Sequence, residues 1–582
     1  MELENIDKSI IAKAQQWLGE NFDEQTRQQV KQLMDENPGE LFESFYTDLE
    51  FGTGGLRGIM GVGSNRMNKY TVGMATQGLA NYLHLMFPNI SEIKVAIAYD
   101  SRNNSKYFAQ ISAEILSANN CKVFLFEELR PTPELSFAIR HLGCQSGIVI
   151  TASHNPKEYN GYKVYWEDGG QLVAPHDDNV IVEVRKITAI DMIRFSAKPE
   201  NIISIGEEVD STYLAEVKKL SFIPEIIHKH KDIRIVYTAL HGTGITLVPT
   251  ALKQYGFENI HLVEEQAIPD GNFPTIKSPN PEEKAALAMA IEKAKLVNAE
   301  LVLATDPDAD RVGVAIKDDK GEYVLLNGNQ TASLLIYYLI NQWKVTGKLL
   351  GKEYIVKTIV TSELLAEIAN KFGVEYFDVL TGFKYIAEII NRFEGQKTFI
   401  GGGEESYGYL VGDFVRDKDA VISCCMIAET AVYAKEQGIS LYALLLEIYK
   451  EFGMYYESLL SITKKGKSGA DEIKQMMNNF RINPPKAINN SIVIAIKDYK
   501  LQKNINTVNG NVANIELPKS DVLQFFTADG SKITIRPSGT EPKIKFYFGI
   551  KAHLKDVSKF KETESACKQK IDAIIEDLAL LQ

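Results

Sequence analysis

The sequence has no excess of basic residues, no cysteine framework and no long apolar run. Its 582 residues carry a formal net charge of −12, so a surface built for non-specific nucleic-acid binding is not expected. The five cysteines are odd in number and have no metal-ligand spacing, which fits a reducing compartment better than a disulfide framework. No stretch approaches about 18 uninterrupted apolar residues, and the N-terminus has no apolar segment with a cleavage site. We therefore expect a cytoplasmic protein that binds neither nucleic acid nor membranes.

Three familiar motifs are also absent or incomplete. The glycine-rich stretch GTGGLRG at 52–58 lacks the Gly-Lys-Ser/Thr ending of a nucleotide P-loop. Gly-x-Ser-x-Gly does not occur at Ser153, which counts against an acyl hydrolase. Alternating aspartates begin at Asp306 as in a calcium EF-hand, but Arg311 and Lys317 stand where that loop needs Gly and Glu. P-loop, acyl-hydrolase and EF-hand chemistry are therefore not expected.

What is present is an alternation of apolar strands and amphipathic helices. Hydrophobic residues make up 45% and charged residues 24% of the chain, as in ordinary soluble proteins, and the length predicts about three to five domains. Three similar α/β units with mainly parallel sheets are predicted. The alternation occupies residues 93–153, 233–304 and 330–400. A long helix is expected over 282–297, amphipathic helices over 1–50, and a mixed α+β segment after about 455.

A hydroxyl-rich loop follows the buried strand expected at Gly147–Ile150. It reads Thr-Ala-Ser-His-Asn-Pro and places Ser153 and His154 just after the strand. Catalytic groups of open α/β sheets lie at the carboxyl ends of strands, so this Ser is well placed for chemistry. A surface turn is the alternative interpretation. His154 is adjacent to Ser153 in sequence and is therefore not expected to act on it as the base of a catalytic triad.

Three aspartates follow the buried strand expected at Leu301–Ala304. Asp306, Asp308 and Asp310 occur at every second position, and in an extended segment that period places their carboxylates on one side. Hard oxygen ligands in this arrangement suit Mg²⁺, with positions left for substrate oxygens or water. Arg311 beside them is suited to holding a phosphoryl oxygen. A solvated acidic turn is the alternative interpretation.

Three further loops carry groups suited to a phosphorylated sugar. The loop at 536–543 has the composition of an anion-binding loop. Its polar residues and glycine are Arg536, Ser538, Gly539, Thr540 and Lys543. Glu404 and Ser406 can exchange hydrogen bonds with sugar hydroxyls, and Arg57 can meet a phosphate. Each loop alone is also consistent with a polar turn or a helix cap, but a Ser facing a metal and cations fits phosphoryl transfer.

With these loops read together, the chain resembles the α-D-phosphohexomutase superfamily of phosphoglucomutases and phosphomannomutases. Within it, the chain is similar to the long-chain branch of bacterial α-phosphoglucomutases and phosphopentomutase-like enzymes. The motifs that carry the resemblance occur in the family's order over roughly residues 50–550. They are GTGGLRG (52–58), TASHNPKEYNGYKVYW (151–166), DPDADR (306–311), LTGFKYI (380–386), GGEESYG (402–408) and RPSGTEPKIKFY (536–547).

The resemblance implies an α/β fold of four domains around one cleft. Three similar α/β domains with mixed, mainly parallel sheets would precede a C-terminal α+β domain. We expect these domains at residues 1–205, 206–328, 329–453 and 454–582. In turn they would carry a phosphoserine loop, a metal-binding loop, a sugar-binding loop and a phosphate-binding loop. The resemblance assigns no role to the helical N-terminal extension or to residues 470–530.

The resemblance also implies roles for individual residues. Ser153 would be phosphorylated in the active enzyme, and its phosphate would bind Mg²⁺ together with Asp306, Asp308 and Asp310. Catalysis would further involve Arg57, His154 and Lys163, with Lys163 as the candidate general base. Substrate binding would involve Arg311, Thr381, Gly382, Glu404, Ser406, Arg536, Ser538, Gly539, Thr540 and Lys543.

The implied activity is that of a phosphosugar mutase acting on a phosphorylated sugar. It would interconvert α-D-glucose 1-phosphate and glucose 6-phosphate through a phosphoserine enzyme and a bisphosphorylated sugar, with glucose 1,6-bisphosphate as activator. Phosphopentomutase or phosphomannomutase activity is the alternative within the family. A Mg²⁺-dependent sugar-phosphate phosphatase is the alternative from another class, with water as the nucleophile. The sequence contains no heptad run and is compatible with a monomer or a homodimer.

Overall fold

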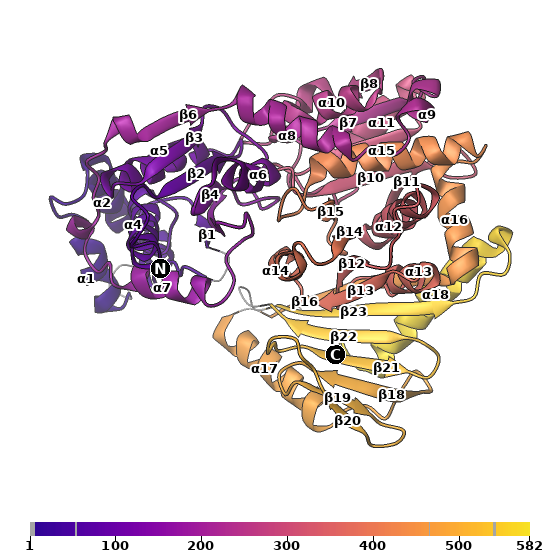
Figure 1. Cartoon of the computed structure of the whole chain (residues 1–582). Coiled ribbons are helices and arrows are strands. Elements are labelled where there is room, and N and C mark those ends of the chain that lie inside the picture. Colours follow the sequence, from indigo (N-terminus) through magenta and orange to yellow (C-terminus); the bar gives the residue numbers. More distant parts are fainter. Residues whose placement is uncertain (1–5, 53–54, 465, 539–542, 582) are drawn as a thin grey trace.

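Four separate β-sheets divide the molecule into four structural units (Figure 1). The computed structural model describes residues 6–52, 55–464, 466–538 and 543–581, without the side chains of 466–468. Mixed sheets with covering helices form the first three units and an antiparallel sheet forms the fourth, so the expected fold class is confirmed. The domain boundaries expected after residues 205, 328 and 453 stay a prediction. Among the described residues, no helix is both long and apolar enough to cross a membrane.

Three helices precede the first sheet and pack on the first unit. They are α1 (Lys8–Gln16), α2 (Glu24–Glu36) and α3 (Pro38–Phe45). Their apolar faces meet at Trp17, whose ring centroid lies 4.6 Å from that of Phe22 and 5.6 Å from that of Tyr70. Tyr70 belongs to α4 (Lys69–Met86) of the first unit, and its hydroxyl donates to Asp23, the residue that caps α2. Apolar and polar contacts therefore join the extension to the first unit, where it was expected.

The first sheet has the strand order β1-β5-β4-β2-β3-β6. Its strands are β1 (Leu56–Ile59), β2 (Lys94–Tyr99), β3 (Lys122–Phe126), β4 (Ser146–Ile150), β5 (Tyr159–Trp166) and β6 (Ile202–Ile205). Besides α4, its helices are α5 (Ser105–Ala118), α6 (Thr132–Leu142) and α7 (His176–Arg185). Neighbouring strands carry three predicted residues: β4 leads into Ser153, β5 carries Lys163 opposite Val149, and β1 carries Arg57 opposite Gly161.

The second sheet has the strand order β11-β10-β9-β7-β8. Its strands are β7 (Arg234–Thr238), β8 (Asn259–Leu262), β9 (Leu301–Thr305), β10 (Val312–Lys317) and β11 (Tyr323–Leu326), and its helices are α8 (Glu207–Lys219), α9 (Pro224–Lys229), α10 (Gly244–Tyr255) and α11 (Ala288–Val297). The helix expected over 282–297 begins only at Ala288, because residues 282–287 form turns. In these turns, Glu282 N donates a hydrogen bond to Asn280 Oδ1, and the Glu282 carboxylate accepts one from Arg311.

The third sheet has the strand order β13-β12-β14-β15. Its strands are β12 (Glu353–Thr358), β13 (Glu375–Val379), β14 (Thr398–Gly403) and β15 (Tyr409–Val411), and its helices are α12 (Gly328–Val345), α13 (Leu364–Phe372), α14 (Phe383–Phe393), α15 (Ala420–Glu436) and α16 (Leu441–Phe452). The glycines at 401–403 belong to β14. The loop itself begins at Glu404, directly after the strand.

The fourth sheet has the strand order β16-β23-β22-β21-β18-β19-β20, with β17 paired to β18. Its strands are β16 (Met454–Thr463), β17 (Ala487–Ile488), β18 (Ser491–Asp498), β19 (Lys503–Asn506), β20 (Val512–Asn514), β21 (Leu523–Thr527), β22 (Lys532–Pro537) and β23 (Lys543–Ala552). Its helices are α17 (Gly466–Ile482) and α18 (Phe560–Asp577). Short 3₁₀ helices elsewhere are η2 (Ile190–Met192), η3 (Pro199–Asn201), η4 (Glu264–Gln266) and η5 (Val557–Lys559).

The first three units share an apolar core, whereas most of the fourth packs around a core of its own. The shared core includes Ala96, Tyr237 and Ile355, one residue from each of the three units. The fourth unit buries Phe525 and Phe546 in a separate cluster between its sheet and helices. Two sets of apolar residues join it to the third unit. Met454, Tyr455, Leu554 and Phe560 extend the shared core into it, and a small cluster is formed by Ile359, Val360, Leu380, Tyr499, Val522 and Tyr547. In Figure 1 the fourth unit lies below the others, against the third.

Candidate active site

One large cavity lies where the loops of the four units meet. Its volume is about 700 Å³. The predicted residues that line it are Arg57, Ser153, His154, Lys163, Asp310, Arg311, Thr381, Gly382, Glu404, Ser406 and Arg536. Asp306 and Asp308 join this wall through hydrogen bonds with Ser153 and Lys163. The structure thus brings predicted residues from all four units to one site.

Ser153 is held in an uncommon backbone conformation just after β4. Its φ of 51° lies in the left-handed region, which few residues other than glycine adopt. The residue is 3% exposed, and its Oγ donates a 2.7 Å hydrogen bond to Asp306 Oδ2. The same Oγ lies 3.2 Å from His154 Nδ1. The two side chains therefore meet although they are neighbours in sequence, a contact that the sequence argument did not expect.

His154 lies in surroundings that disfavour its charged form. Burial is the largest influence that holds the pKa of its imidazole well below the usual value, and the guanidinium groups of Arg311 and Arg57 add to it. The ring is therefore neutral near pH 7, and its Nδ1 lies within hydrogen-bond distance of Ser153 Oγ.

A buried arginine, to which the sequence assigned no role, fixes the serine loop. Arg102 is 3% exposed, and its guanidinium donates to four main-chain carbonyl groups. These carbonyls belong to Ser153, Asn155, Pro156 and Tyr159. Asp100 holds the arginine in turn, with Oδ2 3.3 Å from Nε. Because one rigid side chain binds the loop at several points, the position of Ser153 is set by the end of β2.

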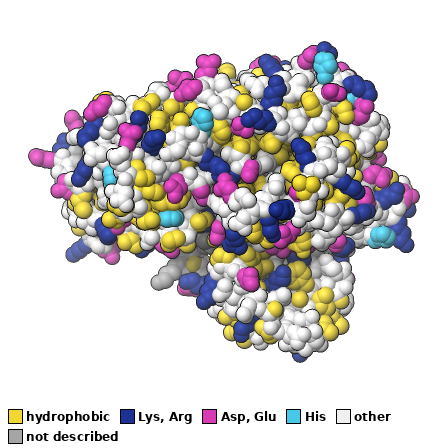
Figure 2. Space-filling view, in the orientation of Figure 1, with side chains coloured by type: hydrophobic (Ala, Val, Ile, Leu, Met, Phe, Trp, Pro, Cys, Tyr) yellow, Lys and Arg dark blue, Asp and Glu magenta, His cyan; other side chains and the backbone are white. Residues whose placement is uncertain are grey.

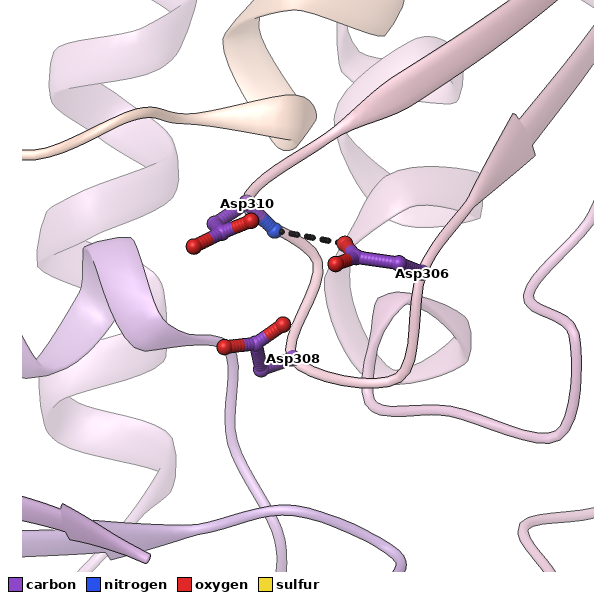
Figure 3. Close-up of side chains that lie close together, drawn as sticks. All are labelled: Asp306, Asp308 and Asp310. Atoms are coloured by element: carbon purple, nitrogen blue, oxygen red, sulfur yellow. Dashed lines mark hydrogen bonds between the residues drawn. The ribbon is translucent and has the colours of Figure 1, made fainter. Parts of the chain in front are cut away.

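The three aspartates converge, although not for the expected reason. Their ligand oxygens lie within 4.8 Å of one another, and all three residues are buried (Figure 3). The segment was expected to be extended, but it forms a turn in which Ala309 has a φ of 50°. Asp306 Oδ1 closes this turn by accepting hydrogen bonds from the N–H groups of Asp310 and Arg311. The turn, and not strand alternation, therefore directs the carboxylates to a common centre.

Two of these carboxylates keep a buried oxygen that is suited to a cation. Asp308 Oδ1 and Asp310 Oδ1 are buried and accept no hydrogen bond within the described part of the chain. Their other oxygens face ammonium groups, with Lys163 Nζ 2.9 Å from Asp308 Oδ2 and Lys418 Nζ 3.1 Å from Asp310 Oδ2. Clustered carboxylates with unpaired oxygens are the ligand set that hard divalent cations prefer. The residues present therefore fit a metal ion.

The pKa values of these carboxyl groups are strongly affected by their surroundings. Burial raises the pKa of Asp306 well above its usual value, and the charges of Asp308 and Asp310 raise it further. Burial also acts to raise the pKa of Asp308, but the ammonium of Lys163 and hydrogen bonds outweigh it and hold the pKa far below its usual value. A divalent cation at the centre would favour the ionised form of the whole group.

Lys418 completes the positive side of this centre, and it was missed in the sequence. Its Nζ lies 3.1 Å from both Asp310 Oδ2 and Asp417 Oδ1, and it lines the cavity. Asp417 also accepts a 2.5 Å hydrogen bond from Tyr165 of β5. The segment before α15 therefore links the third unit to the first and second. Its charged run, Arg-Asp-Lys-Asp before an apolar helix, was the available signal.

The third unit joins two of the predicted loops through one carboxylate. Glu404 Oε1 accepts a 2.9 Å hydrogen bond from Gly382 N. Gly382 has a φ of 117°, a conformation that favours glycine. Thr381 and Ser406 line the cavity beside them. Two loops expected to bind substrate, that of Thr381 and Gly382 and that of Glu404 and Ser406, therefore lie side by side on the cavity wall.

The neighbouring Glu405 faces hydroxyl groups of its own unit. Its Oε2 accepts hydrogen bonds from the hydroxyls of Thr358 and Thr361, each at 3.3 Å. Burial is the main cause that raises the pKa of Glu405 to about 7, and the charge of Glu404 contributes. Glu405 therefore gives the loop a support from the end of β12 that the motif alone did not indicate.

The fourth unit supplies two adjacent cations. Arg536 on β22 lies directly opposite Lys545 on β23, and both line the cavity. Burial lowers the pKa of Lys545, and the charge of Arg536 lowers it further. Lys545 was not predicted, although strand pairing across the motif places it beside Arg536. On the face shown in Figure 2, basic and acidic side chains are interspersed, so anion binding depends on local clusters of this kind.

The remainder of the predicted phosphate loop is only partly described. Ser538 N donates a 2.8 Å hydrogen bond to Lys543 O, which joins the end of β22 to the start of β23. Of the described residues of this loop, Arg536 lines the cavity. The predicted residues Gly539 and Thr540 lie outside the described residues.

Four known domain families match the chain in order. They are the alpha/beta/alpha domains I, II and III of phosphoglucomutase/phosphomannomutase and the C-terminal domain of the same family. The matches cover residues 48–191, 211–321, 327–452 and 493–564. The order is the one that the sequence motifs implied.

Named relatives cover nearly the whole length. A phosphoglucomutase from Staphylococcus haemolyticus is 39% identical over 519 residues, which is 87% of this chain and 91% of the relative. A phosphoglucomutase from Staphylococcus aureus (strain MRSA252) is 40% identical over 513 residues, with 88% and 91% covered.

Solved structures share the fold at low sequence identity. The open form of the exocytosis-sensitive phosphoprotein parafusin, a phosphoglucomutase from Paramecium, matches with a TM-score of 0.67 at 17% identity, covering 92% of this chain and 96% of that one. A phosphoglucomutase/phosphomannomutase family protein from Burkholderia thailandensis matches with a TM-score of 0.61 at 18% identity, covering 91% and 98%. With its ordered domain matches and relatives near 40% identity, the chain belongs to the phosphoglucomutase/phosphomannomutase family of the α-D-phosphohexomutase superfamily.

Proposed function

We propose that the protein is a phosphosugar mutase that interconverts α-D-glucose 1-phosphate and glucose 6-phosphate. The observation that carries this proposal is Ser153 Oγ, 2.7 Å from Asp306 in the carboxylate cluster and on the wall of the shared cavity. A hydroxyl beside a cation site is arranged to carry a phosphoryl group. Arg536 and Lys545 on the same cavity wall are suited to a second phosphate. The Staphylococcus relatives are named phosphoglucomutases, which supports glucose phosphates as substrates.

In the proposed reaction, phosphorylated Ser153 transfers its phosphoryl group to the sugar and later takes one back. The bond between phosphorus and Ser153 Oγ breaks as a bond to a free sugar hydroxyl forms. The hydroxyl proton passes to Lys163, our candidate general base, which has to be in its neutral amine form at this step and becomes the ammonium paired with Asp308. The bisphosphorylated sugar then turns end for end in the cavity. Ser153 Oγ accepts the other phosphoryl group, and Lys163 returns the proton to the oxygen that is released. The net change is an isomerisation of the sugar phosphate.

The remaining side chains of the site bind and orient the substrate. Arg57, His154 and Arg311 lie on the cavity wall with Ser153 and are suited to the oxygens of the transferring group. Glu404 and Ser406, with Thr381 and Gly382, would contact sugar hydroxyls. The phosphate that does not react would bind the fourth unit, through Arg536, Ser538, Gly539, Thr540 and Lys543.

We propose Mg²⁺ as the metal, held by Asp306, Asp308, Asp310 and the phosphate on Ser153. When bound, it supplies positive charge that stabilises the transferring phosphoryl group. Glucose 1,6-bisphosphate is the proposed activator, because Ser153 must take up a phosphoryl group before the first turnover. The orphaned oxygens of Asp308 and Asp310 support the metal site.

Intact-mass measurement together with a product assay tests the proposal. Wild-type protein treated with glucose 1,6-bisphosphate is expected to carry one covalent phosphate and to form glucose 6-phosphate from glucose 1-phosphate. Ser153→Ala is expected to lose both. Wild-type protein that releases inorganic phosphate stoichiometrically without forming glucose 6-phosphate would instead be a phosphatase, and the mutase proposal would be wrong.

A substrate panel tests the choice of sugar. Glucose, mannose, ribose and deoxyribose 1-phosphates are compared at equal concentration with the bisphosphate activator present. The highest kcat/KM is expected for glucose 1-phosphate. A higher value for a pentose or mannose phosphate would identify a phosphopentomutase or phosphomannomutase and leave the phosphoserine mechanism in place.

A further inference from the structure

One strand of the fourth unit carries two cavity residues, one of which also binds the third unit. Lys532, Thr534 and Arg536 alternate along β22 and therefore share one face of the sheet. Arg536 and Lys532 both line the cavity, and Lys532, at the start of the strand, is 8% exposed and contacts the third unit. Gln524 of β21 lies opposite Thr534 on the same face. This face meets the third unit.

Two side chains of this face bind the main chain that follows β12. Lys532 Nζ donates to Ile359 O at 3.1 Å, to Thr361 O at 3.3 Å and to Glu363 Oε1 at 2.5 Å. Gln524 Nε2 donates to the same Ile359 carbonyl at 2.8 Å. The segment from Ile359 to Glu363 is therefore fastened to the fourth unit through two carbonyl groups and a carboxylate.

The same segment supports the sugar-facing loop of the third unit. The Thr361 hydroxyl donates to Glu405 Oε2 at 3.3 Å, and Glu405 lies between the predicted sugar-binding residues Glu404 and Ser406. Thr361 is fully buried, and its hydroxyl also lies 2.8 Å from the hydroxyl of Thr358, the other donor to Glu405. One residue thus contacts Lys532 through its carbonyl and the sugar loop through its hydroxyl.

The charges at this contact make it unlike an ordinary surface ion pair. Glu363 Oε1 is shared with Lys357, which is fully buried and also lies 2.8 Å from Asp378. Glu363 itself is 35% exposed and keeps Lys357 when Lys532 is removed, so the cost falls mainly on the carbonyl groups of Ile359 and Thr361, which lose a charged donor. In contrast, Lys551 and Glu367 link the same two units at 2.7 Å with side chains 41% and 43% exposed. Pairs of that kind contribute little.

We infer that Lys532 is a positioning residue that sets the phosphate-binding face of the fourth unit against the sugar-binding loop of the third. Through Thr361 and Glu405, it fixes the span between Arg536 and the pair Glu404–Ser406. That span has to match the distance between the phosphate and the hydroxyls of one bound sugar. The inference rests on the proposed function, because the two loops are assigned to the two ends of a sugar phosphate.

The first test compares two methionine variants that remove an interdomain ammonium group. Lys532→Met is expected to raise KM for glucose 1-phosphate about tenfold and to leave kcat within about threefold, because binding that is equal in ground and transition states changes KM alone. Phosphate on Ser153, measured by intact mass, is expected to stay at the wild-type level. Lys551→Met, the matched control, is expected to change KM less than about twofold. Equal KM values for the two variants would overturn the inference.

The second test asks whether Lys532 acts through Thr361. Thr361→Val removes the hydroxyl that contacts Glu405, and the double variant is expected to raise KM no further than Lys532→Met alone, because linked residues are not additive. Independent, multiplying effects would overturn the inference. If Lys532→Met does not fold, Gln524→Leu replaces it, with an expected KM increase of about threefold, and an unchanged KM would then overturn it. A failed proposed function is recognised separately, since wild-type protein itself would then lack phosphoserine and mutase activity.

Discussion

Ser153 and Arg536 line the same cavity, yet the molecule supports them in different ways. Ser153, Asp306, Asp308 and Asp310 are each at most 3% exposed, and their supports come from three units that share an apolar core. Arg536 is only half-buried and belongs to a unit that packs mostly around a separate core, although Met454, Tyr455, Leu554 and Phe560 of that unit extend the shared core. The bond-forming groups are therefore fixed within the shared core, whereas the groups proposed to hold the second phosphate are half-buried on a unit that packs mostly on its own.

The largest loss of activity is expected for Asp308→Asn, which changes one of the fixed, bond-forming groups. The variant removes a charged ligand from the carboxylate centre and the partner of Lys163. We expect kcat/KM to fall at least about a thousandfold, since preorganised charge in such sites is worth that much. Chelation with EDTA is expected to abolish wild-type activity and Mg²⁺ to restore it.

The matched control for this variant is Asp319→Asn, which changes an exposed aspartate beyond β10 of the same sheet. Its kcat/KM is expected to match the wild-type value. Asp308→Asn protein with near-normal activity, or wild-type protein insensitive to EDTA, would contradict the metal site.

Arg102→Met tests whether the serine loop is preorganised by its carbonyl contacts. Without the guanidinium, the loop loses hydrogen bonds at four carbonyl groups, and Ser153 Oγ is no longer held against Asp306. Misplacement of a reacting group by about 1 Å costs up to about a hundredfold, so we expect kcat to fall by that order while KM changes little. The measurement is steady-state kinetics on protein whose folding is checked by circular dichroism.

Lys106→Met is the control for this loop variant. Lys106 lies on α5, the helix that follows Arg102, and makes an exposed ion pair with Glu128. It is expected to keep wild-type kcat. A loss confined to KM in Arg102→Met would show that the arginine serves binding and not the position of Ser153.

Arg536→Ala acts on the half-buried side and is expected to change binding more than turnover. Loss of a charged hydrogen bond of about 1.5–3 kcal/mol corresponds to an increase of KM by about ten- to a hundredfold. Arg392→Ala removes a 59% exposed arginine of the third unit and is the control. The comparison between the two sides fails if Arg536→Ala abolishes kcat and leaves KM unchanged.

The smallest expected effect is a pH dependence of stability at Glu405. Burial raises the pKa of this carboxyl group to about 7, above its usual 4.5, so the folded protein holds the proton more tightly than the unfolded chain. This contribution is fully present below about pH 4.5 and is lost as the pH rises to about 7, by at most about 1.4 kcal/mol per pH unit. Glu405→Gln is expected to gain thermal stability relative to wild type between pH 5 and pH 7.5.

Thermal unfolding at the two pH values checks this expectation, with Glu225→Gln at an exposed position as the control. The control is expected to follow the wild-type curve. The same difference in midpoint between Glu405→Gln and wild type at both pH values would show that Glu405 does not titrate in this window.

Much of the fixed side could be predicted from sequence, because its residues follow buried strands. Apolar runs predicted β4 and β9, and polar residues directly after them marked Ser153 and the aspartates. The reason given for convergence of the aspartates was wrong, because Ala309 in a left-handed conformation replaces the expected extended segment. Periodicity carries no information on such a turn.

Residues that reach the site from distant segments were missed for a different reason. Lys418 contacts Asp310 across more than a hundred residues of sequence, and Arg102 donates hydrogen bonds to a loop that begins some fifty residues later. Neither contact leaves a local pattern, since each depends on how the units pack. Glu282 illustrates the reverse case: its contact with Arg311 accompanies turns where helical spacing predicted a helix.

The backbone at Ser153 has a consequence for which amino acid can occupy this position. Two amino acids carry an aliphatic alcohol, and their hydroxyls are chemically alike as phosphoryl acceptors. With φ at 51°, however, the extra methyl of a β-branched side chain is strained against the main chain. Ser153→Thr therefore keeps a hydroxyl that can accept a phosphoryl group, but the backbone conformation at this position disfavours threonine. The loop restricts the choice to serine before any phosphate is bound.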